Sequence, residues 1–124
     1  MQEETIVKVL IAEDNAQNMY MARFLLENSG HSVIQAGDGE QAVRLADECK
    51  PDVILMDMQL PKLDGYGATT LIKANEHSCH IPVIAFTALA MKGDEEKTRE
   101  AGCDAYISKP IDPATFVQQI EAVV

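Results

Sequence analysis

Short apolar runs alternate with longer amphipathic stretches along this chain. The apolar runs are rich in β-branched residues and are bounded by glycine, proline and aspartate, which is typical of buried strands. The expected strands are Ile6–Ala12, His31–Ala36, Val53–Met56, Ile81–Phe86 and Ala105–Ser108. The second run is shorter and more polar, which indicates an edge strand.

The stretches between these runs have the spacing of helices. The first can be capped by Asp14 or Asn15, and it places Met21, Phe24 and Leu25 on one face. Further helices are expected from about Glu40, over Tyr66–Ala74, over Met91–Ala101 and from Asp112 or Pro113. Five strand–helix units predict an α/β fold, in which a doubly wound (βα)5 domain has a five-stranded parallel sheet covered by helices on both faces.

Length and composition limit the function classes. The 124 residues fit a single domain over 1–124, and no apolar run approaches the roughly 20 residues of a membrane-spanning helix. Asp and Glu outnumber Lys and Arg by 20 to 10, so the acidic surface is expected to repel nucleic acid. The three cysteines form no C-x-x-C pair and the first residues are polar, so we expect a cytoplasmic protein without a membrane partner.

The strand ends carry the candidate chemistry, because ligands of open parallel sheets bind outside the carboxyl ends of the strands. The first strand is followed by Glu13 and Asp14, the third by Asp57, the fourth by Thr87 and the fifth by Lys109. An acidic residue after a strand is by itself usually a loop residue or a helix cap. The inference therefore depends on the whole set.

Three carboxylates at one sheet edge would repel each other, by about 4 kcal/mol for a pair 4 Å apart at an effective dielectric near 20. A hard divalent cation relieves this repulsion, and oxygen-only ligands favour Mg²⁺ over zinc or copper. Lys109 and Thr87 would suit the oxygens of a phosphoryl group. Asp57 stands alone after the central apolar run, so it is the best candidate for a nucleophile that forms an acyl phosphate, whereas Glu13 and Asp14 fit metal binding.

These residues lie in four motifs. The motifs are Ala12–Asn15, Leu55–Pro61 with Gly65, Phe86–Ala90 and Ser108–Ile111. Through them the chain resembles the receiver domains of two-component response regulators, which have the flavodoxin-like CheY fold. The resemblance covers Ile6 to Val123. Two further stretches, Met91–Glu96 and Gly102–Ile111, are most similar to single-domain regulators of the cell-cycle type.

The resemblance implies a role for each residue of the site. Asp57 would be the phosphoacceptor, and Mg²⁺ (or Mn²⁺) would be held by Glu13, Asp14, Asp57 and the backbone carbonyl of Gln59. The phosphoryl oxygens would be bound by Thr87, Lys109 and the backbone of Ala88. The peptide bond before Pro110 would be cis. The donor would be a histidine kinase or a phosphotransfer protein, and the domain would be a signalling switch rather than an enzyme.

The resemblance also implies a conformational switch of Thr87 and Tyr106. Thr87 would move toward the phosphoryl group, and the Tyr106 ring would fill the vacated space; the alternative is a half-buried strand tyrosine with no switching role. A downstream protein would read the face formed by the fourth helix, fifth strand and fifth helix. Gln59 and Leu89 stand where the family tunes phosphoryl lifetime, and the apolar Leu89 favours slow self-dephosphorylation.

Other functions fit the sequence less well. Haloacid-dehalogenase-like phosphatases need a second aspartate two residues after the nucleophile, where this chain has Gln59. The Gly37–Gly39 turn lacks the third glycine of a dinucleotide-binding motif. A scaffold without phosphorylation would gain nothing from crowded carboxylates. His77–His80 lacks a fourth zinc ligand. Whether the domain stands alone or is part of a larger protein stays open.

Overall fold

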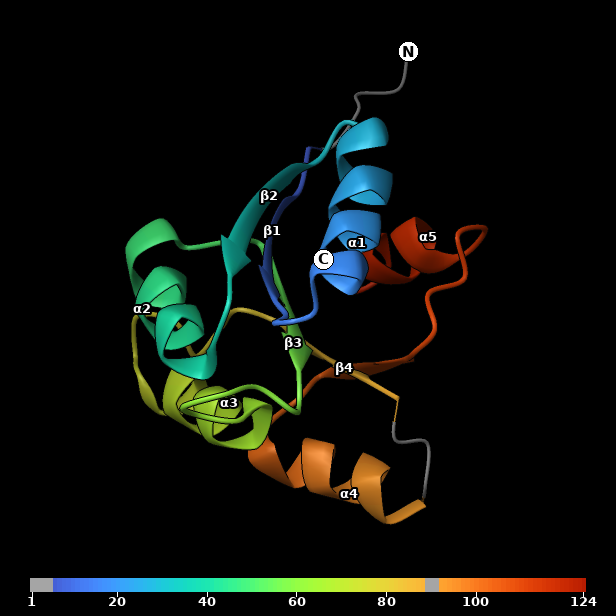
Figure 1. Cartoon of the computed structure of the whole chain (residues 1–124). Coiled ribbons are helices and arrows are strands. Elements are labelled where there is room, and N and C mark those ends of the chain that lie inside the picture. The colour runs from blue at the N-terminus through green and yellow to red at the C-terminus, as the bar shows by residue number, and fades with distance from the viewer. Residues whose placement is uncertain (1–5, 89–91) are drawn as a thin grey trace.

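The computed structural model describes residues 6–88 and 92–124, which form a five-stranded parallel sheet flanked by five helices (Figure 1). The strands are β1 (Lys8–Ala12), β2 (Ser32–Ala36), β3 (Val53–Asp57), β4 (Val83–Thr87) and β5 (Ala105–Ser108). The helices are α1 (Ala16–Asn28), α2 (Gly39–Cys49), α3 (Gly65–Ala74), α4 (Lys92–Ala101) and α5 (Phe116–Glu121). The predicted doubly wound (βα)5 fold is confirmed.

The order of the strands is β2-β1-β3-β4-β5, so β3 is central and the more polar β2 lies at an edge, as predicted. Side chains of a strand alternate between the two faces of the sheet. Leu10 and Ala12 of β1 therefore pack with α2 and α3, whereas Val9 and Ile11 pack with α1 and α5. Figure 1 shows these two helix pairs on opposite sides of the sheet.

The apolar face expected for α1 is only partly correct, because Leu25 packs against the core whereas Met21 and Phe24 do not. Met21 and Phe24 are 44% and 54% exposed, and the fully buried residues of this helix are Ala22 and Leu26. Apolar residues occur on every side of α1, so periodicity alone does not identify the face that packs on the sheet. The two predicted caps are now distinguished, because Asn15 Oδ1 accepts a hydrogen bond of 2.9 Å from the Asn18 amide.

The last helix begins later than predicted. Asp112 does not start α5 but forms a turn before it, in which its side chain accepts from the Ala114 amide and its carbonyl accepts from the Thr115 and Phe116 amides. The helix then begins at Phe116, and it packs through Phe116 and Ile120, both fully buried. The predicted helix start at Met91 lies outside the described residues.

Candidate functional site

Three carboxylates meet at the carboxyl edge of the sheet. The register pairs Ala12 of β1 with Met56 of β3, so Glu13 and Asp57 follow at neighbouring positions. One carboxylate oxygen each of Glu13, Asp14 and Asp57 lie within 4.8 Å of one another. Glu13 and Asp57 are buried and Asp14 is exposed, so the cluster opens to solvent on one side.

Lys109 supplies the positive charge of the site. Its Nζ lies 2.7 Å from Glu13 Oε1 and 3.2 Å from Asp57 Oδ2. The side chain is only 15% exposed, and Nζ also lies 4.8 Å from the centre of the Phe86 ring, within the range of a cation–π contact. The Lys109 amide donates to the Thr87 carbonyl at 2.9 Å, which fixes the end of β5 beside β4. The ammonium is therefore held between two carboxylates.

Backbone amides orient the two buried carboxylates. The Gln59 amide donates to Asp57 Oδ1 at 3.0 Å, and the Asn15 amide donates to Glu13 Oε2 at 3.1 Å. In each residue one oxygen is held by an amide and the other faces Lys109. The Asp57 carboxylate thus has a fixed direction before any ligand arrives.

The pKa of Glu13 reflects the electrostatics of the cluster. Burial raises the pKa of this carboxyl above its ordinary value, and the neighbouring Asp57 raises it further. The Lys109 ammonium and the Asn15 amide act against this and lower the pKa. The rise prevails, because burial, together with the nearby Asp57, outweighs the lowering by Lys109 and Asn15.

The donor set fits a hard divalent cation. The three ligand groups are all carboxylates, which Mg²⁺ prefers, and the described residues contain no other group of three or more His, Cys, Asp or Glu placed to hold an ion. One ammonium against three carboxylates leaves two charges uncompensated if all are ionised, so a divalent cation would balance the site. The exposed position of Asp14 leaves room for water, which Mg²⁺ retains when it binds to proteins.

A close approach of backbones holds the loop after Asp57. A Cβ added to Gly65 would lie 2.3 Å from the Asp57 carbonyl oxygen and 2.6 Å from Met58 Cα. The Gly65 amide donates to the Met58 carbonyl at 3.1 Å, and Asp64 caps α3 through a bond of 2.8 Å from the Gly67 amide. Only glycine lets α3 begin this close to the end of β3.

The remaining predicted residues lie on the same edge or beside it. Thr87 is 2% exposed, and its register partner is Ser108, directly before Lys109. Ala88 is exposed at the end of β4. The Lys109–Pro110 peptide bond is cis. Leu89, for which a shielding role is expected, lies outside the described residues.

Tyr106 lies on β5, away from the three carboxylates. It is half-buried, packs against the core formed with α2 and α3, and lines a groove of about 290 Å³ that Arg99 and Glu95 of α4 also line. This position is compatible both with a switching ring and with a static strand residue.

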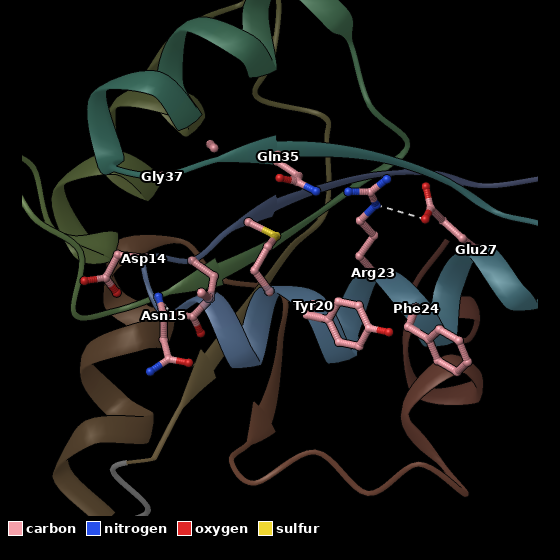
Figure 2. Close-up of a pocket in the computed structure, with 12 residues that line it drawn as sticks. Asp14, Asn15, Tyr20, Arg23, Phe24, Glu27, Gln35 and Gly37 are labelled. Carbon is pink, nitrogen blue, oxygen red and sulfur yellow. Dashed lines mark hydrogen bonds and ion pairs between the residues drawn. The ribbon is translucent and has the colours of Figure 1, made fainter.

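Sequence reasoning missed two features. Phe86 is expected only as a strand residue, but its ring contacts the Lys109 ammonium; its place as the next-to-last residue of β4 gives no sign of such a contact. The second is a cavity of about 540 Å³ that extends from Asp14 along α1, with Tyr20, Phe24 and Gln35 in its lining (Figure 2). It lies along the exposed side of α1, which includes Phe24, one of the residues expected to share an apolar face.

Among residues 6–88 and 92–124, none of the helices has the length and apolar character of a membrane span.

Comparison with known proteins gives consistent matches over nearly the whole chain. The family model for the response regulator receiver domain matches residues 9–121. The polar-differentiation response regulator DivK of Brucella anthropi is 50% identical over 114 residues, which are 92% of this chain and 93% of that protein. DivK of Brucella ovis is 51% identical with the same coverage.

Solved structures agree. The receiver domain of a sensor histidine kinase from Pseudomonas aeruginosa PAO1, with a magnesium ion coordinated in its active-site cleft, is 39% identical. It superposes with a TM-score of 0.89 over 96% of this chain and 98% of that one. The chemotaxis protein CheY4 of Vibrio cholerae has a TM-score of 0.90 over 97% of this chain and 100% of its own, at 22% identity, which shows the shared fold.

Proposed function

The chain belongs to the family of response regulator receiver domains, which act in two-component signalling, and from this premise we propose that Asp57 is the residue that accepts the phosphoryl group. The observation that carries the proposal is its position at the end of the central strand, with Oδ1 held by the Gln59 amide and Oδ2 facing Lys109. A carboxylate fixed in this way is a prearranged nucleophile.

The proposed cofactor is Mg²⁺, with Mn²⁺ as a substitute of similar coordination. Its ligands would be the carboxylates of Glu13, Asp14 and Asp57 and the backbone carbonyl of Gln59. The cluster of three carboxylates supports this, as does the magnesium ion in the cleft of the related Pseudomonas domain. A bound divalent ion would neutralise charge on the phosphoryl oxygens during transfer.

In the proposed reaction the donor is a phosphohistidine of a histidine kinase or a phosphotransfer protein. An oxygen of Asp57 attacks the phosphorus atom while the nitrogen–phosphorus bond breaks and its electron pair returns to the imidazole ring. The product is an acyl phosphate on Asp57. Lys109, the Thr87 hydroxyl and the Ala88 amide would bind the phosphoryl oxygens, and Lys109 already points into the site.

The proposed output is a change in the surface formed by α4, β5 and α5. Thr87 would shift toward the phosphoryl group and Tyr106 would repack, and a downstream protein would read the altered face. The half-buried position of Tyr106 beside the groove at α4 supports this. A buried tyrosine hydroxyl requires a partner, so a swing of the ring would change both packing and hydrogen bonding.

The proposed scope is narrow. Residues 1–124 would act as one receiver domain in the cytoplasm, with no activity beyond its own phosphotransfer and dephosphorylation. The net charge of −10 disfavours binding to nucleic acid and to the anionic surface of a membrane.

The test is incubation with acetyl phosphate and Mg²⁺, followed by intact mass measurement. The parent should gain one phosphoryl group, and Asp57→Asn should gain none. Asp47→Asn is the matched control, because Asp47 is an exposed carboxylate on α2, away from the site, and this variant should behave like the parent. Equal phosphorylation of Asp57→Asn and the parent would refute the proposal.

A further inference from the structure

His31 is a buried histidine at the amino edge of the sheet, the edge opposite Asp57. It directly precedes β2, and its side chain is 3% exposed. Gly30, with φ +90°, ends the turn after α1 in the left-handed region, and the His31 amide donates to the Leu26 carbonyl at 3.0 Å. The backbone thus directs the ring inward. The proposed phosphorylation chemistry gives this residue no role.

Both ring nitrogens of His31 have partners, and the partners are of opposite kinds. The Val7 amide lies 3.1 Å from Nδ1, and a backbone amide can only donate, so Nδ1 must carry a lone pair. Nε2 lies 2.8 Å from Oε2 of Glu121, and a carboxylate can only accept when ionised, so Nε2 must carry the proton. A neutral ring with its proton on Nε2 satisfies both contacts. A second proton, on Nδ1, would point at the Val7 N–H, so that two donors would face each other with no acceptor between them.

The two partners belong to distant parts of the chain. Val7 immediately precedes β1, and its carbonyl accepts from the Ser32 amide at 3.0 Å. Glu121 is the last residue of α5 and lies 90 residues from His31. The helix has only six residues. Phe116 and Ile120 are its buried side chains, Val117 and Val123 pack partly against the same core, and the contact of Glu121 with His31 adds a polar tie at its last residue.

We propose that His31 carries a single ring proton and links two distant segments. Its Nδ1 accepts a hydrogen bond from the Val7 amide, and its Nε2–H donates one to the Glu121 carboxylate. Together these two bonds, which we call the His31 latch, hold the last turn of α5 to the amino edge of the sheet. The latch goes beyond the proposed function, because it does not involve Asp57 or the metal ligands. Its one connection to the proposed function is α5, which is also part of the proposed output surface.

The first test is nuclear magnetic resonance of the full chain with ¹⁵N-labelled histidine at neutral pH, with the His31 signals assigned by their loss in His31→Gln. The latch predicts an unprotonated Nδ1, a protonated Nε2 and a scalar coupling between Nδ1 and the Val7 amide nitrogen across the hydrogen bond. A proton on Nδ1, with or without one on Nε2, overturns the proposal.

The second test is amide hydrogen exchange in variants. In His31→Leu the amides of Val7, Ala122 and Val123 should exchange about tenfold faster or more, as expected for lost hydrogen bonds to buried or charged groups. His31→Gln should stay near the parent, because its side chain can both accept from Val7 and donate to Glu121. Fast exchange in the glutamine variant as well as in the leucine variant would contradict the latch.

If His31→Leu does not fold, Glu121→Ala tests the same contact from the other side. The Glu121 side chain is 46% exposed, so its removal should leave the fold intact. This variant should accelerate exchange at Ala122 and Val123 about tenfold. Glu76→Ala is the control, because it removes the same charge from a side chain that is 89% exposed in a distant loop, and it should change neither amide. Unchanged exchange at Ala122 and Val123 in Glu121→Ala would overturn the proposal.

Discussion

The ammonium nitrogen of Lys109 lies 3.2 Å from Oδ2 of Asp57, although 52 residues separate the two in the chain. The parallel sheet brings them together, because β3 and β5 both deliver their carboxyl ends to the same edge on either side of β4. The site is therefore a product of topology rather than of local sequence.

Lys109→Gln should slow phosphorylation of Asp57 by acetyl phosphate by about a hundredfold, the scale of losing one well-placed donor in a transition state. Binding of Mg²⁺ should persist, since the ammonium is not a metal ligand. The rate is measured by intact mass over time at saturating Mg²⁺. Lys97→Gln, which removes an exposed positive charge from α4, should keep the parent rate, and equal rates in both variants would contradict this role.

Asp14→Asn should weaken Mg²⁺ binding by about tenfold or more, because a charge about 4 Å from a cation is worth about 1–4 kcal/mol per unit charge at a partly exposed site. Titration calorimetry gives the affinity. In the parent, Mg²⁺ should also raise the melting temperature, since it binds the folded cluster and relieves its repulsion. A melting temperature that is the same with and without Mg²⁺ would count against a metal site here.

Gly65→Ala should destabilise the fold by about 1–3 kcal/mol and also reduce phosphorylation, because the added Cβ would push α3 away from the Asp57 carbonyl. Denaturant unfolding measures the stability. Gly37→Ala is the matched control, since a Cβ there would meet only the Gln41 side chain, at 3.8 Å. A Gly65 variant as stable as the Gly37 variant would show that the close approach is unimportant.

Cys103 should react slowly with iodoacetamide. Burial raises the pKa of its thiol from 9.0 to about 11, and thiolate is the reactive form. At pH 8 this rise leaves about a hundredfold less thiolate, and the rate should keep increasing about tenfold per pH unit until about pH 11. Mass mapping should find the exposed Cys79 labelled first, and labelling of Cys103 at the rate of Cys79 would contradict the shift.

The sequence predicts that these charged side chains meet, because they lie at or just after the carboxyl ends of strands. Apolar runs give the positions of the strands, and a parallel sheet sends all of their carboxyl ends to one edge, so Glu13, Asp14, Asp57 and Lys109 could be grouped without coordinates. The structure brings their charged groups together as that grouping requires.

Features that depend on packing could not be predicted in this way. The exposure of Met21 and Phe24 could not be predicted because α1 has apolar residues all around it, and only the fit against the sheet selects Ala22 and Leu26 for the core. The start of α5 was wrong because Asp112, a typical helix cap, forms a separate turn before the helix. The contact of Phe86 with Lys109 depends on side-chain directions that spacing does not contain.

The most direct measurement is to locate the phosphoryl group itself. Chain phosphorylated with acetyl phosphate and Mg²⁺ is reduced with borohydride, which converts an aspartyl phosphate to homoserine, and the peptides are then sequenced by mass spectrometry. We expect homoserine at position 57 and at no other aspartate. Homoserine at Asp14 or another position, with Asp57 intact, would contradict the assignment of Asp57 as phosphoacceptor.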